Sequence, residues 1–118
     1  MLDRLLNQVN ILEKGLDASA LKSDCIAGNI ANVDTVGYKA KSVDFESVFR
    51  DSLDTGSFSA AQATITENRH TSIRMDGNNV DIDAEMAELA KNSVLYEALT
   101  YSVSKELGRI KLVINEGR

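Results

Sequence analysis

The chain has 118 residues, enough for one domain but too few for a second domain with its own core. Its net charge is -5 and no basic cluster is interleaved with aromatic residues, which argues against nucleic acid or an anionic membrane as a main partner. No apolar run approaches the roughly 18 residues of a membrane span, so we expect no membrane insertion. The single cysteine excludes an internal disulfide and a multi-cysteine zinc site.

An apolar heptad pattern at the start of the chain predicts a long helix over residues 3–33. Apolar side chains recur there at alternating spacings of three and four, the pattern of a coiled-coil seam. The same register continues through Ser19 and Ser23, whose small side chains would let a neighbouring helix approach closely. Gly15 and Gly28 weaken the helix by about 1 kcal/mol each relative to alanine, so we expect it to need partners for full order. The side chains expected to pack are Leu2, Leu5, Val9, Leu12, Leu16, Ile26 and Ile30.

Residues 29–39 predict a sharp turn where this helix ends. Gly37 is the residue most tied to geometry, because a reversing turn commonly needs one residue at positive φ. Val36 and Gly37 would then occupy the two central turn positions. Asn32 and Asp34 suit the helix exit, since their short side chains tolerate left-handed conformations and bond nearby backbone.

The spacing Asn-x-x-Asn-x-x-Thr-x-Gly-Tyr-Lys in this turn resembles the signature of the bacterial flagellar rod, hook and hook-associated axial proteins. Val36 departs from the signature, because that family most often has proline there. Proline would preset φ, so valine leaves the unassembled loop freer by about 0.4 to 1 kcal/mol. The matching signature residues are Asn29, Asn32, Thr35, Gly37, Tyr38 and Lys39.

Between the two long helices the sequence predicts short elements. Apolar residues at mixed spacing within residues 42–50 favour a short amphipathic helix. Residues 51–62 are rich in Ser, Asp, Gly and Ala, and predict a loop. Alternation within residues 63–66 and 71–75 favours two short strands, which we expect to pair with each other as a β-hairpin.

The last part of the chain predicts a second long helix, over residues 83–115. A strong turn signal precedes it, and Asp81 and Asp83 are candidate N-caps. The acidic cluster does not match the spacing of a calcium-binding EF-hand, so we expect no metal site there. Its apolar face is wider than a two-stranded seam, so neighbouring subunits would have to cover part of it. The side chains expected to pack are Met86, Leu89, Tyr96, Val103, Leu107, Ile110 and Ile114.

Together these patterns predict a mainly α fold: a single rod-type domain over residues 1–118. Its N-terminal helix (3–33) and C-terminal helix (83–115) would pair as a coiled-coil-like hairpin, joined by a turn and variable middle segment (34–82). Each helix would be about 45 to 50 Å long. From periodicity alone a self-contained helical-hairpin adaptor is the favoured interpretation, and the signature shifts the balance towards an axial protein. One histidine, one cysteine and dispersed carboxylates indicate no catalytic residues, so we expect neither an enzyme nor a cofactor.

Within the axial family, the short chain and residues 76–86, followed by Ala90, Asn92 and Tyr96, resemble the proximal rod subunit. A FlgC-type rod subunit is the alternative, but its last helix usually follows a Tyr-Pro entry that is absent here. The resemblance implies a structural subunit that assembles helically, transmits torque and encloses the export channel. It implies contacts with FlgC, FlgF and FlgG, with FliE and the membrane ring, and with copies of itself. It also implies a place in the basal-body rod in the periplasmic space, after flagellar type III export without a cleaved signal peptide.

Overall fold

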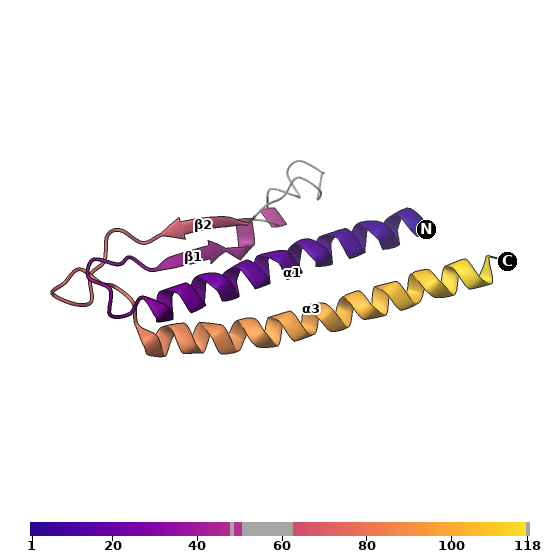
Figure 1. The fold of residues 1–118 in the computed structure, drawn as a ribbon. Helices are drawn as coiled ribbons and strands as arrows, with labels where there is room; N and C mark the ends of the chain where they lie inside the picture. Colours follow the sequence, from indigo (N-terminus) through magenta and orange to yellow (C-terminus); the bar gives the residue numbers. More distant parts are fainter. Residues whose placement is uncertain (48, 51–62, 118) are drawn as a thin grey trace.

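The computed structural model describes residues 1–47, 49–50 and 63–117. Two long helices dominate it: α1, Leu2–Ala31, and α3, Ile82–Glu116. They lie side by side and antiparallel, with both chain termini at the same end (Figure 1). The molecule is therefore an elongated helical hairpin, 67 Å along its longest axis. The expected mainly α fold with paired terminal helices and a short middle segment is confirmed.

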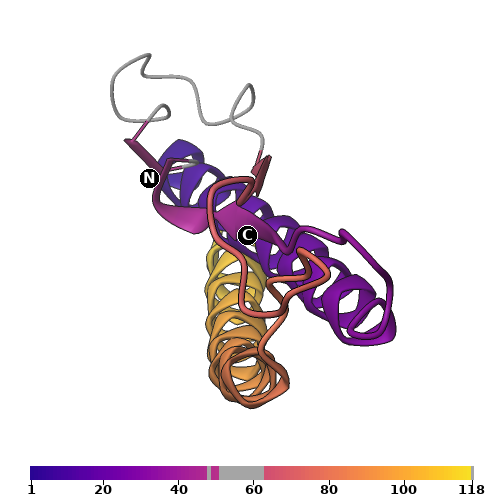
Figure 2. The same cartoon turned by 90° about the vertical axis from the view of Figure 1, so that its left-hand side faces the viewer.

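A small antiparallel sheet lies along α1. Strand β1, Lys41–Asp44, pairs with β2, Thr64–Glu67, with Lys41 opposite Glu67 and Asp44 opposite Thr64. Figure 2 looks onto the end of the molecule where the turns lie and shows the strands to one side of the helix pair. Val43 is the buried residue of β1, and its strand neighbours are exposed. The alternation of an extended strand thus directs a single apolar side chain into the core.

The two expectations for the middle segment have different outcomes. The helix expected over residues 42–50 is confirmed in part, because residues 45–47 and 49–50 are helical, while β1 takes the place of its start. The expected pairing of residues 63–66 with 71–75 does not form, because β2 pairs with β1 instead. The backbone N–H groups of Ile73 and Arg74 donate to the carbonyl of Asn78 in the turn before α3. These two donors are therefore not available to a neighbouring strand. The loop expected over residues 51–62 lies outside the described residues.

The core is thin. The buried apolar side chains of the described residues are few, and Phe45 and Ala63 pack against one of them, Ala18. The Phe45 and Phe49 rings also contact each other, with centroids 5.3 Å apart. Because so little apolar surface is enclosed, much of the apolar surface of the two helices stays open to its surroundings. The buried apolar residues are Ala18, Cys25, Ile26, Val43 and Val80.

Local chemistry explains where α3 begins. Asp81 is its N-cap, and the carboxylate accepts hydrogen bonds from the backbone N–H groups of Asp83 (3.1 Å) and Ala84 (3.3 Å). Of the two candidate caps, Asp81 therefore has this role, and Asp83 lies inside the first turn, where its charge suits the helix dipole. In the described part of the chain, neither helix has a stretch long and apolar enough to cross a membrane.

Candidate functional site: the helix-exit junction and the helix faces

The signature turn has the predicted backbone geometry. The backbone N–H of Tyr38 donates to the carbonyl of Thr35 at 3.3 Å, which places Val36 and Gly37 at the centre of a four-residue turn. Gly37 has a φ of +71°, as expected for the third position of a type II turn. Asn32 ends α1 with a φ of -103°, and its side chain donates to the Gly28 carbonyl at 2.8 Å.

Asn32 suits the helix exit through hydrogen bonds and not through a left-handed backbone. In the described residues positive φ occurs at Gly37 and Gly77 and at no non-glycine residue, so Asn32 and Asp34 are not left-handed. The bond from the Asn32 side chain to nearby backbone is the part of the expectation that is confirmed. Thr35 adds a further hydrogen bond, since its hydroxyl donates to the side-chain oxygen of Asn32 at 3.1 Å.

Asn29 joins three elements through one buried side chain. Its amide nitrogen donates to the carbonyl of Lys41 at 2.8 Å, and its oxygen accepts from the backbone N–H of Lys41 at 2.9 Å. The same amide nitrogen donates to the Glu85 carboxylate on α3 at 3.1 Å. The Tyr38 hydroxyl donates to the Asn29 oxygen at 3.2 Å, and burial raises the pKa of this hydroxyl above its ordinary value. The Asn29 side chain thus pairs with both backbone groups of Lys41, as a neighbouring strand would at the start of β1.

The signature turn docks onto the turn that precedes α3. The backbone N–H of Gly37 donates to the Asp76 carbonyl at 3.0 Å, and a Cβ placed on Gly77 would lie 3.6 Å from the Gly37 Cα. Lys39 reaches across to the same region, where its ammonium group donates to the carbonyls of Thr71, at 2.9 Å, and Gly77. The six signature residues therefore form one junction between α1, β1 and the entry to α3.

The contact between α1 and α3 is polar at its centre. The Ser19 hydroxyl donates to the side-chain oxygen of Asn92 at 2.9 Å. In return the Asn92 amide donates to the Ser19 carbonyl at 2.8 Å and to the Ser23 hydroxyl at 2.7 Å. One helical turn away, Lys22 pairs with Glu88 at 3.0 Å, and hydrogen bonds from Lys22 and Lys91 lower the pKa of Glu88. Buried amide bonds of this kind fix the register of two helices, because a shift by one turn would leave every group without its partner.

The expected packing residues of α1 and α3 divide by exposure. Ile26 is buried, whereas Leu2 on α1 and four members of the α3 set are exposed. Those four exposed side chains are Met86, Tyr96, Leu107 and Ile114. The half-buried members are Leu5, Val9, Leu12, Leu16, Ile30, Leu89, Val103 and Ile110.

The α3 residues that meet α1 are offset by one position from the expected seam. Glu85, Glu88 and Asn92 bond to α1, and Leu99 lies opposite Gly15. Glu85 and Glu88 directly precede two of the expected packing residues, Met86 and Leu89, a rotation of about 100° around the helix. The chain's own hairpin thus uses a face of α3 that is polar near the start of the helix, and it leaves Met86, Tyr96, Leu107 and Ile114 exposed.

Ser19, Asn29 and Asn92 stand out in the sequence, but the burial of polar side chains was not predicted from it. Ser19, Asn29, Asn78, Asn79 and Asn92 are all buried, and four of them are asparagines. A usable signal was present for Asn92, because it falls at helical spacing with Glu85 and Glu88, as a polar stripe beside the apolar one. Asn78 and Asn79 carried no such signal, since asparagine in a turn normally serves its own backbone.

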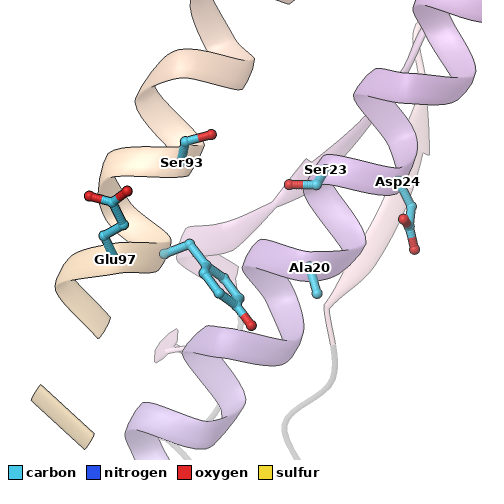
Figure 3. Close-up of a pocket in the computed structure, with 6 residues that line it drawn as sticks. Ala20, Ser23, Asp24, Ser93 and Glu97 are labelled. Atoms are coloured by element: carbon cyan, nitrogen blue, oxygen red, sulfur yellow. The ribbon is translucent and has the colours of Figure 1, made fainter. Parts of the chain in front are cut away.

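A groove of about 450 Å³ runs between the two helices beside this polar contact. Figure 3 shows Ala20, Ser23 and Asp24 of α1 on one side of it and Ser93 and Glu97 of α3 on the other. Most of these side chains are short, so a group that enters the groove could come close to the helix backbones. The two carboxylates that line the groove belong to Asp24 and Glu97. In the part of the chain that the structure describes, no group of three or more His, Cys, Asp or Glu is arranged to hold a metal ion.

Comparison with known proteins agrees with the signature. The family described as "Flagella basal body rod protein" matches residues 9–39, which include the whole signature. The FlgB flagellar basal body rod protein of Bacillus subtilis (strain 168) is 36% identical, over 91% of this chain and 92% of its own length. The chain belongs to the FlgB family. FlgB of Escherichia coli (strain K12) is 30% identical over 98% of this chain, and FlgB of Proteus mirabilis (strain HI4320) is 29% identical over 99%.

Membership in the FlgB family confirms the expected class of protein over the FlgC-type alternative. The chain is a structural subunit of the flagellar basal body rod. The similarity to whole FlgB chains extends beyond α1 and the signature to α3, so both helices and the junction belong to the shared architecture.

Proposed function

We propose that this chain is a subunit of the proximal rod, and that neighbouring rod subunits cover the apolar residues that α3 leaves exposed. One observation carries the proposal: α3 already has α1 as a partner, yet large apolar side chains remain exposed along it. An exposed apolar stripe of this length on a small monomer indicates a protein interface. The exposed side chains are Ile82, Met86, Val94, Tyr96, Tyr101, Leu107, Leu112 and Ile114.

The exposed residues lie on more than one side of α3. Leu107 and Ile114 flank the α1 contact, whereas Val94, Tyr101 and Leu112 fall about half a turn from Asn92, on the opposite side. A helix with apolar residues on opposite sides is suited to an interior position, between two helical neighbours. This arrangement supports a place for α3 in a continuous helical layer, with the terminal helices forming the inner layer of the rod around the export channel.

The hairpin also has the properties that transmission of torque requires. Register-fixing bonds between Ser19 and Asn92 resist sliding of one helix past the other. In this proposal stiffness comes from many such contacts, no residue performs catalysis and no cofactor is bound. The signature residues set the angle at which the chain leaves the inner layer.

The proposed partners follow from this position. They are the other rod proteins FlgC, FlgF and FlgG, further copies of this chain, and FliE with the membrane ring at the base. The proposed route is flagellar type III export without a cleaved signal peptide, to the rod in the periplasmic space. The proposed domain is a single unit over residues 1–118. The thin core of the single chain and its wide exposed stripe support an assembly-dependent fold of this kind.

Far-ultraviolet circular dichroism with light scattering tests the proposal on the purified chain, first dilute and alone, then mixed with each candidate rod subunit. We expect weak helicity alone, because few apolar side chains are buried, and a gain of helix together with increased scattering in the mixture that contains a true neighbour. A fully helical monomer or dimer whose helicity and scattering do not change with any rod subunit would instead favour the self-contained hairpin adaptor.

A further inference from the structure

Asn78 lies in the turn before α3, yet its side chain binds the segment that follows α1. The residue is completely buried. Its amide nitrogen, which has two hydrogens, lies within hydrogen-bond distance of three carbonyls in the chain that follows α1: Asn32 at 3.0 Å, Val33 at 2.9 Å and Thr35 at 2.8 Å. The last carbonyls of α1 itself are served locally, since the backbone N–H of Asn32 donates to Gly28 and that of Val33 donates to Ile30. The carbonyls of the exit segment instead take a partner from more than forty residues downstream.

The rest of Asn78 is fixed as firmly as its amide nitrogen. Its side-chain oxygen accepts from the backbone N–H of Val80 at 2.8 Å, which orients the amide. Its carbonyl accepts from the backbone N–H groups of Ile73 and Arg74, each at 3.1 Å. The Arg74 guanidinium in turn donates to the Val33 carbonyl and contacts the Asp34 carboxylate at 3.5 Å. Asn78 therefore binds the segments on both sides of the junction to each other.

We infer that Asn78 is a positioning residue for rod assembly: by binding the exit segment after α1 from the entry of α3, it sets the direction in which the chain leaves the helix pair. This inference rests on the proposed function, and it assigns the exit angle to a residue outside the signature. The signature glycine allows the turn, but several exit directions are compatible with its backbone conformation. The hydrogen bonds from Asn78 to the carbonyls of Asn32, Val33 and Thr35 select one of them.

The neighbouring residue provides a matched control. Asn79 is also buried, and its side-chain oxygen also accepts from a backbone N–H, that of Ala40 at 2.6 Å. Its amide nitrogen, however, donates to the Asn68 carbonyl (2.8 Å) and the Thr71 hydroxyl (3.1 Å), at the end of the sheet. N78D and N79D each keep the acceptor and lose the donors, so they differ mainly in which carbonyls lose their partner.

Hydrogen exchange on the full-length chain, mixed with its rod neighbours, tests the inference. In N78D we expect the backbone amides of Thr35, Gly37 and Tyr38 to exchange about tenfold faster or more, while β1 and β2 stay protected. In N79D we expect the reverse pattern. Equal protection of the exit amides in N78D and in the unsubstituted chain, or equal loss in both variants, would overturn the inference. If N78D does not fold, N78S removes the amide donors without adding a carboxylate and carries the same expectation.

Recovery of the variants in basal bodies purified from cells gives the second readout. We expect N78D to be incorporated at least about tenfold less than N79D at equal cellular amounts, because a subunit with a free exit angle cannot match its neighbours. Equal incorporation of the two variants would overturn the inference. Absence of the unsubstituted chain from basal bodies would instead contradict the proposed function itself, so the two failures are distinguishable.

Discussion

Asn92 and Ser19 exchange two hydrogen bonds across the helix pair, one in each direction, at 2.8 and 2.9 Å. Asn92 is only 2% exposed, so neither bond can be replaced by water without opening the hairpin. The pair joins the middle of α1 to the first third of α3 and therefore sets the register of the two helices. It also explains why small residues interrupt the apolar pattern of α1 at Ser19 and Ser23.

Replacement of Asn92 by alanine should lower the free energy of unfolding of the hairpin by about 1 to 3 kcal/mol, because it leaves buried polar groups of Ser19 without their partner. Urea unfolding of the purified chain in a stabilising osmolyte measures this change. Asn115→Ala, at an exposed position near the end of the same helix, is the control and should change the midpoint little. An unchanged midpoint in N92A would show that the exchange of bonds does not stabilise the pair.

Gly37→Val should destabilise the junction, because its φ of +71° is strained for a β-branched residue. The expected loss is about 1 to 2 kcal/mol in urea unfolding, with reduced assembly into rods. Nothing lies within 4 Å of the position a Cβ would take, so the effect comes from backbone conformation and not from a clash. Gly37→Asn is the matched variant, since asparagine tolerates this region, and should lose less. Equal losses for valine and asparagine would argue against a conformational cause.

The Lys22–Glu88 pair predicts a dependence of stability on pH. Hydrogen bonds from Lys22 and Lys91 lower the pKa of Glu88 below its ordinary value of 4.5. A group whose pKa is lower in the folded state stabilises the fold above its unfolded pKa, and this contribution is lost as the pH falls through the folded value. Thermal unfolding should therefore show a midpoint that falls on acidification below 4.5, and E88Q should flatten this part of the profile. Identical acid profiles for E88Q and the unsubstituted chain would exclude the pair as the cause.

Leu107→Asp should block incorporation into rods without changing the helicity of the separate chain. Leu107 is 52% exposed in the hairpin, so a carboxylate there costs the monomer little, but it would be buried without a partner beneath a neighbouring subunit. Motility and the amount of chain in purified basal bodies report the effect. Ser104→Asp, at an exposed polar position on the same helix, should assemble normally. Normal motility in L107D would contradict the proposed interface.

The long helices and the turn between them were predictable because each rests on local chemistry. Apolar spacing of three and four indicated α1 and α3, Asp81 marked the start of α3, and a single glycine indicated the turn at Gly37. The pairing of β2 was not predictable in this way. Its partner β1 is separated from it in sequence by residues 45–63, and Val43 became a strand residue because α1 offers it a place in the core.

The candidate site was predictable only in part, and the reason is physical. Apolar periodicity shows which face of a helix needs cover, but it does not say whether the cover comes from the same chain. In α3 the chain's own partner takes the polar face at Glu88 and Asn92, and the apolar face beside it stays open. The long-range role of Asn78 was hidden for a related reason, since its partners come together only in the folded junction.

Cysteine labelling at position 107 tests the central claim most directly. In a Cys25→Ser background, which removes the one native thiol, Leu107→Cys should react readily with a maleimide in the dilute chain, because this position is exposed in the hairpin. In purified basal bodies the account predicts strong protection of the same thiol, because a neighbouring rod subunit covers it. Equal labelling of the free chain and of the assembled rod would contradict the claim that rod subunits bind the apolar face of α3.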